Sequence, residues 1–176
     1  MSDGVVKLAY HEFRDKWQAV EDEVIEEGFV SIFVNGSELA TVMSSPREPD
    51  RLALGFLCNE GIIGGLDDVR AVHICPSGAC VDVWLKRADF VRPDRLILTS
   101  GCGGGVTFDD LSKTVEPLDA PLTISPARLS GLMLKMQQRG TLYARSRGVH
   151  TSALSDGEGI VALAEDVGRH NTIDKL

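Results

Sequence analysis

Long apolar runs and an excess of basic residues are both missing from this sequence. No stretch of about 18 apolar residues occurs, and a membrane-spanning helix needs roughly that length. The 176 residues include 18 lysines and arginines against 26 aspartates and glutamates, which gives a formal net charge of −8. Nucleic-acid phosphates require a basic face, so this balance argues against a protein that binds nucleic acid nonspecifically.

Cysteine is also sparse, with four in the chain, Cys58, Cys75, Cys80 and Cys102. Residues 1–17 carry charges throughout and lack the apolar stretch of a secretory signal, so we expect a cytoplasmic protein. Thiols stay reduced in the cytoplasm, and the four cysteines are therefore not expected to form a disulfide framework.

Internal repeats and low-complexity linkers are absent as well, and the length fits one ordinary domain spanning 1–176. Apolar periodicity, caps and turn residues predict a mixed α/β fold with a three-layer core. The predicted strands are 29–34, 38–43, 69–74, 80–85, 95–99 and 160–164, and the predicted helices lie near 50–59, 126–138 and 150–154. The pair Asn35-Gly36 predicts a tight hairpin turn between the first two strands.

Glycine, by contrast, is concentrated around one cysteine. The segment "LTSGCGGGVTF", residues 98–108, places four glycines next to Cys102 directly after an apolar run. A structural cysteine favours a packed apolar site, whereas a glycine loop presents its thiol, and the backbone N–H groups of such a loop can stabilise an anion. Cys102 is therefore a candidate reactive thiol, and the competing interpretation is a surface loop with an incidental cysteine.

The other cysteines suggest less. "HICPSGAC" holds His73, Cys75 and Cys80, but structural zinc sites favour two close ligand pairs, and this spacing does not supply them. We expect these two cysteines to have a structural role beside a hairpin turn. Cys58 lies in an apolar helical segment and is expected in the core.

A second polar cluster follows the last predicted strand. "AEDVGRHN" places Glu165, Asp166, Arg169, His170 and Asn171 at a strand end, where α/β proteins keep their sites. Arginine can clamp a phosphate with two hydrogen bonds, and histidine titrates near neutral pH. The alternative is a solvated helix entry with the asparagine as its cap.

His150 lies at the start of the predicted helix 150–154, where helix N–H groups can help to bind a phosphate. A histidine at a helix start beside cysteines also outlines a zinc deaminase, whose motif is H-x-E followed by a later P-C-x-x-C. Here Thr151 and Ser152 follow the histidine, and no cysteine comes after it. No metal site is therefore predicted.

The last residues, 172–176, begin a helix with a good cap but stop within two turns. Such a short helix is unstable alone in water. We expect it to be poorly ordered or to rest on a neighbouring subunit, with further residues completing the domain.

Four segments occur in one order over residues 34–176: "VNGSELATVMSSPREPDRLALGFLCNEGII", "TSGCGG", "GVHTSAL" and "AEDVGRHNTIDKL". In this order they resemble the FdhD family, the formate dehydrogenase accessory sulfurtransferases. The resemblance implies a fold similar to cytidine deaminase without its zinc site, and a homodimer. It also implies that the chain is the N-terminal part of a longer protein.

The function that the resemblance implies is sulfur delivery. A cysteine desulfurase would load Cys102 with a persulfide, and the sulfur would pass to a bis-guanine-dinucleotide molybdenum or tungsten cofactor for formate dehydrogenase. The residues expected to hold the cofactor are Gly103, Gly104, His150, Arg169, His170 and Asn171.

The chain departs from the family's loop, because Gly105 stands where a second cysteine is usual. Two alternatives to the sulfur carrier therefore stay open. One is a chaperone that binds the cofactor without sulfur chemistry, and the other is a degenerate relative that only dimerises or regulates.

Overall fold

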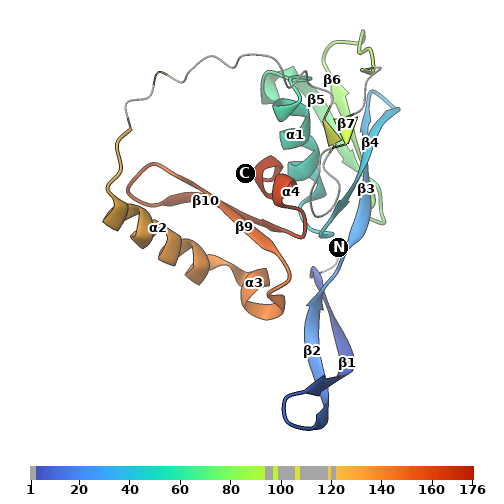
Figure 1. Cartoon of the computed structure of the whole chain (residues 1–176). Coiled ribbons are helices and arrows are strands. Elements are labelled where there is room, and N and C mark those ends of the chain that lie inside the picture. The colour runs from blue at the N-terminus through green and yellow to red at the C-terminus, as the bar shows by residue number, and fades with distance from the viewer. Residues whose placement is uncertain (1–2, 94–96, 99–105, 108–118, 120–121) are drawn as a thin grey trace.

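The computed structural model describes residues 3–93, 97–98, 106–107, 119 and 122–176 (Figure 1). Strands and helices mix along the described residues, which confirms the predicted α/β class. Cys102, Gly103 and Gly104 lie outside the described residues.

A four-stranded sheet forms the centre of the fold. Its strands are β3 (Gly28–Val34), β4 (Ser37–Ser44), β5 (Val69–Ile74) and β6 (Cys80–Leu85). They are arranged in the order β4-β3-β6-β5, with β3 and β6 parallel and the other pairs antiparallel. All four strands confirm the sequence predictions. Asn35 and Gly36 have positive φ of 50° and 80°, as a tight hairpin turn requires.

Helix α1 (Pro49–Asn59) covers one face of this sheet. The buried side chains of the helix are Pro49, Leu52, Ala53, Phe56 and Leu57, and those of the sheet include Val30, Ile32, Val34, Val81, Val83 and Leu85. Alternate residues of β6 are buried, so the residues between them lie on the opposite face of the sheet. Each large aliphatic side chain buried here contributes about 1.5–3 kcal/mol, which makes this the main hydrophobic core.

The second half of the chain contains α2 (Pro126–Arg139), α3 (Thr141–Ser146), β9 (His150–Ser155) and β10 (Ile160–Asp166). Strands β9 and β10 form an antiparallel hairpin, and α2 packs along it. Ser125 caps α2 by accepting a hydrogen bond from the Arg128 backbone N–H, and this helix was predicted correctly.

The predicted helix 150–154 is wrong, because these residues form β9. A strand needs a partner for its backbone hydrogen bonds, and the turn at Asp156-Gly157 returns β10 directly beside the preceding residues. Gly157 has a φ of +90°, and Asp156 Oδ1 accepts hydrogen bonds from two backbone N–H groups within the turn. Pairing between β9 and β10 therefore decides the conformation of residues 150–154, against the local sequence pattern that predicted a helix.

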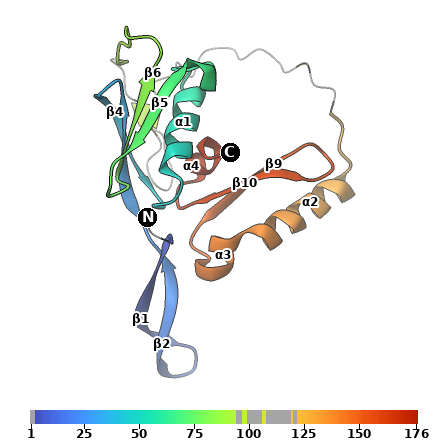
Figure 2. The same ribbon diagram turned by 180° about the vertical axis from the view of Figure 1, so that it is seen from behind.

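The short helix α4 (Arg169–Asp174) begins earlier than predicted and rests on α1 of the same chain (Figures 1 and 2). An added Cβ at Gly55 would overlap the backbone carbonyl of Asp174, so the absent side chain allows the two helices to meet. The expectation of a poorly ordered tail, or one resting on a neighbouring subunit, is therefore wrong.

A hairpin of β1 (Val5–Phe13) and β2 (Trp17–Ile25) extends away from the main body, and it was not predicted (Figures 1 and 2). Most of its residues are exposed. Charged side chains therefore occupy both faces of these strands and interrupt the alternation of apolar and polar residues that identifies a strand in the sequence. In the part of the chain that the structure describes, no helix is long and apolar enough to cross a membrane.

Candidate functional site

The connection that contains Cys102 runs between two short strands. Strands β7 (Ile97–Leu98) and β8 (Val106–Thr107) pair antiparallel, with Leu98 opposite Val106. The described residues on either side of 99–105 are therefore paired with each other. The described part of the predicted strand 95–99 is β7.

The base of this connection is fixed to the end of α1. Thr107 Oγ1 donates a hydrogen bond of 3.0 Å to Glu60 Oε2, directly after the helix. The preceding residue, Asn59, donates through Nδ2 to Asp174 Oδ1 at 2.7 Å. Two hydrogen bonds thus connect β8 to α1 and α1 to α4.

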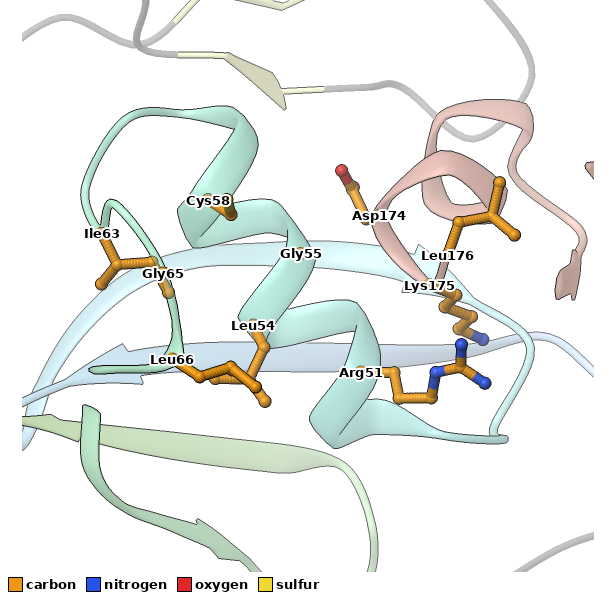
Figure 3. Close-up of a pocket in the computed structure, with 10 residues that line it drawn as sticks. All are labelled: Arg51, Leu54, Gly55, Cys58, Ile63, Gly65, Leu66, Asp174, Lys175 and Leu176. Atoms are coloured by element: carbon orange, nitrogen blue, oxygen red, sulfur yellow. The ribbon is translucent and has the colours of Figure 1, made fainter. Parts of the chain in front are cut away.

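A cavity of about 270 Å³ lies where α1 and α4 meet (Figure 3). Its lining is mainly apolar, with an arginine, a cysteine and an acid among the side chains. The lining residues are Arg51, Leu54, Gly55, Cys58, Ile63, Gly65, Leu66, Asp174, Lys175 and Leu176. An apolar cavity with a few polar groups is typical of a small-molecule binding site.

Cys58 is exposed and lines this cavity, so the expectation that it belongs to the core is wrong. The apolar stripe of α1 turns Leu52, Phe56 and Leu57 toward the sheet. Cys58 follows directly after that stripe and lies on the other side of the helix.

Asp174 is the acid of the cavity. Burial raises the pKa of its carboxyl to about 6, and the negative charges of Glu60 and Asp166 add to the rise, while the hydrogen bond from Asn59 opposes it. The carboxyl therefore titrates closer to neutral pH than an ordinary aspartate.

We expect the Asp174→Asn variant to be about 1–3 kcal/mol more stable at pH 7. The folded chain holds a proton on Asp174 up to pH about 6, whereas the unfolded chain loses it near the ordinary value of 3.8. Stability contributed by this group is thus present below the ordinary pKa and falls as the pH rises from about 4 to 6.

Urea unfolding at several pH values measures this effect, with the exposed Asp67→Asn variant as control. The asparagine at 174 should flatten the slope between pH 4 and 6, and the control should keep it. An unchanged slope in Asp174→Asn would contradict the buried acid.

The polar cluster after β10 has a different geometry from the one expected. Asp166 is fully buried, and its carboxylate accepts from Lys175 Nζ at 2.6 Å and from Ser44 Oγ at 2.8 Å. It also accepts from Asn171 Nδ2 at 2.8 Å. Backbone N–H groups of Ser45 and Gly168 complete the set at 3.1 and 2.7 Å. Asp166 therefore joins α4 to the end of β4, as a structural centre.

Glu165 is also structural. Its carboxylate accepts hydrogen bonds of 2.9 Å from the backbone N–H groups of Thr141, Leu142 and Tyr143. Those are the first N–H groups of α3, so Glu165 caps this helix from a neighbouring strand.

The four described residues among those predicted to hold the cofactor divide into two groups. His150, Arg169 and His170 are exposed, and β9 pairs His150 with Asp166, so that all three come from one end of the β9–β10 hairpin. Asn171 is buried, and its Nδ2 donates to Met43 O at 2.7 Å in addition to Asp166. Its side-chain amide thus connects α4 to β4.

A smaller polar cavity of about 140 Å³ opens next to this end of the hairpin. Arg47, Arg139 and Glu165 are among its lining residues, and Arg139 Nη1 donates a hydrogen bond of 2.8 Å to Ile160 O. Glu48, which also lines it, has a left-handed φ of 49°, an unusual conformation for a residue other than glycine. The sequence motifs singled out neither arginine, since the two lie on segments far apart in the chain.

Among the residues that the structure describes, no group of three or more His, Cys, Asp or Glu side chains lies close enough to hold a metal ion. His73, Cys75 and Cys80 thus do not gather as ligands.

Comparison with known proteins adds independent information. The family model described as the FdhD/NarQ family matches residues 25–176. The sulfur carrier protein FdhD of Anaeromyxobacter dehalogenans is 34% identical over 174 residues, which cover 90% of this chain and 60% of that protein. The protein of the same name in Bacillus subtilis is 32% identical, with 93% and 67% covered.

A crystal structure described as that of a formate dehydrogenase accessory protein from Desulfotalea psychrophila is similar over 98% of this chain and 67% of its own, with a TM-score of 0.70 and 18% identity. That likeness concerns the fold alone. The chain spans about 60% of the length of the Anaeromyxobacter relative.

Proposed function

Because the chain belongs to the FdhD/NarQ family, we propose that it is a sulfur carrier that serves formate dehydrogenase. In this proposal a cysteine desulfurase supplies the sulfur, and Cys102 carries it as a persulfide. The acceptor is the bis-guanine-dinucleotide molybdenum or tungsten cofactor, which is a substrate of the protein. The relatives named sulfur carrier protein FdhD support this role.

The observation that supports the proposal is the glycine-rich sequence around Cys102, which lies in the chain between β7 and β8. These two strands pair with each other, and Thr107 of β8 is hydrogen-bonded to Glu60 at the end of α1. Four glycines surround the thiol in sequence, so no larger side chain within Gly101–Gly105 competes with an incoming sulfur donor.

The loading step moves one sulfur atom without net oxidation. The Cys102 thiolate attacks the outer sulfur of the desulfurase persulfide, the S–S bond of that persulfide breaks, and the desulfurase thiolate leaves. The product is a persulfide on Cys102.

Incubation with a cysteine desulfurase and cysteine tests the proposal. The intact chain should gain ~32 Da for each sulfur atom, and reductant should reverse the gain. A chain that gains no mass would reject the sulfur carrier.

The second candidate is a chaperone that binds the cofactor without sulfur chemistry. Gly105 in place of a second loop cysteine favours it, and so do the arginine-lined cavity and the exposed Arg169 at the same end of the β9–β10 hairpin. Arginine and histidine side chains suit phosphate groups of a guanine dinucleotide.

Under both candidates, Arg169→Ala should weaken binding of a guanine nucleotide by about 1.5–3 kcal/mol, which is the cost of losing a charge-assisted phosphate clamp. His170→Ala should have a smaller effect. Calorimetric titration with guanosine diphosphate measures both, and Arg92→Ala, an exposed arginine elsewhere, is the control. Equal affinity in the original chain and Arg169→Ala would remove Arg169 from the site.

Two finer features also belong to this proposal, namely the partners and the arrangement of the complete fold. The partners are a cysteine desulfurase, formate dehydrogenase and a second copy of the chain in a homodimer. The cytidine-deaminase-like arrangement without a zinc site is the expected arrangement of the complete fold.

A further inference from the structure

The turn between β5 and β6 brings two cysteines together. Cys75 and Cys80 flank Pro76–Ala79, and the Cys75 backbone N–H donates to Cys80 O at 3.0 Å. Since Ile74 is opposite Val81, the next pair along the two strands is Cys75 and Cys80, and opposed residues of antiparallel strands have Cα atoms about 4.5–5.5 Å apart, within the range that a disulfide spans.

The two sulfur atoms have different environments. Cys75 Sγ accepts the Cys80 backbone N–H at 3.0 Å and lies 3.2 Å from Ser77 Oγ. Hydrogen bonds from the Cys80 thiol and from Ser77 lower the pKa of the Cys75 thiol to about 7. The same interaction raises the pKa of the Cys80 thiol. Cys75 is thus the thiol of the pair that loses its proton more readily, and Cys80 is the one that keeps it.

The pair is accessible and lies away from the cavity between α1 and α4. Both cysteines are partly exposed. Val81 and Val83 of β6 point into the core under α1, so Cys80 lies on the opposite face of the sheet. The titratable side chains next to the pair on that face are His73 and Asp82, which are opposed across β5 and β6.

A purely structural role does not explain this arrangement. The turn itself is closed by backbone hydrogen bonds, since Gly78 N–H donates to Cys75 O at 2.8 Å. A disulfide across so short a loop restricts the unfolded chain little and adds little stability. The geometry is therefore better suited to a bond that forms and breaks.

We propose that Cys75 and Cys80 form a thiol–disulfide exchange site, with Cys75 as the attacking thiol and Cys80 as the resolving thiol. Its substrates are disulfides of small thiols. The Cys75 thiolate attacks a disulfide RSSR, one RS⁻ leaves, and a mixed disulfide Cys75–S–SR forms. Cys80 then loses its proton and attacks the Cys75 sulfur, which releases the second RS⁻. The two cysteines are oxidised by two electrons, and RSSR is reduced to two thiols.

Glutathione disulfide is the probe for this site. At pH 7 the chain should lose ~2 Da as the internal disulfide forms, and peptide mapping should find Cys75 joined to Cys80. In Cys80→Ser the reaction should stop at the mixed disulfide, a gain of ~305 Da on Cys75. The Cys75 thiol should react roughly threefold faster than an exposed thiol of ordinary pKa, since its larger thiolate fraction outweighs its lower nucleophilicity.

Cys58→Ser is the matched control, because Cys58 is exposed but lies on α1 across the sheet. This variant should form the Cys75–Cys80 disulfide as the original chain does. Two results would overturn the proposal: no disulfide between these cysteines in the original chain, or no glutathione on Cys75 in Cys80→Ser. Both readouts are independent of sulfur loading on Cys102.

Discussion

Lys175→Met is expected to lower the free energy of unfolding by about 3–5 kcal/mol, a large effect for one side chain at the end of a short helix. Lys175 and Asp166 are both fully buried, with 2.6 Å between Nζ and Oδ2. Removing the ammonium leaves a buried carboxylate without its counter-charge. Methionine keeps most of the side-chain volume, so the loss reports charge rather than packing.

Urea unfolding measures the effect, with Lys135→Met on the exposed surface of α2 as the control. The double variant Asp166→Asn/Lys175→Met removes both charges, so it should lose less stability than the two single changes combined. A loss below about 1 kcal/mol for Lys175→Met, equal to the control, would contradict a buried ion pair that holds α4 in place.

This ion pair changes how the motif "EDVGRHNTIDK" is interpreted. The sequence alone predicts a ligand site from its charged and polar residues. In the structure, Glu165 caps α3, while Asp166, Asn171 and Lys175 bind one another and the end of β4. Among the charged and polar residues of the segment, only Arg169 and His170 are exposed. The contacts that bury Asp166, Asn171 and Lys175 are with residues more than a hundred positions away, so a local motif could not separate the structural residues from the exposed ones.

The strands of the central sheet could be predicted because their signals are local. Buried and half-buried residues alternate along β6, and Asn35-Gly36 adopts the left-handed backbone of a hairpin turn. The secondary structure at His150 was predicted wrongly because it depends on pairing with a later strand and not on a local signal. Gly148, two residues before His150, suggests a helix start, but pairing with β10 across the Asp156 turn decides the conformation.

The cavity between α1 and α4 could not be predicted from the sequence either. Gly55 would weaken α1 as an isolated helix, and its purpose becomes clear only where the Asp174 carbonyl approaches it. Cys58 and Asp174 are likewise far apart in the chain and meet only through the docking of α4 on α1. A helical glycine inside an apolar stripe was the available signal for such a close approach.

The central claim concerns Cys102, and we expect Cys102→Ser to abolish sulfur loading. The other three cysteines have described positions: Cys58 on α1, and Cys75 and Cys80 at the β5–β6 turn. Cys102 is the one cysteine in the glycine-rich connection between β7 and β8. With Gly105 in place of a second loop cysteine, no resolving thiol stands inside that connection, so the persulfide should persist until an acceptor arrives.

The most direct measurement is peptide-resolved mass spectrometry after incubation with a cysteine desulfurase and cysteine. The peptide that contains Cys102 should gain ~32 Da per sulfur atom in the original chain and in Cys58→Ser, Cys75→Ser and Cys80→Ser, and Cys102→Ser should gain nothing on any peptide. Undiminished loading of Cys102→Ser, or sulfur found on Cys75 or Cys80 in place of Cys102, would contradict the account.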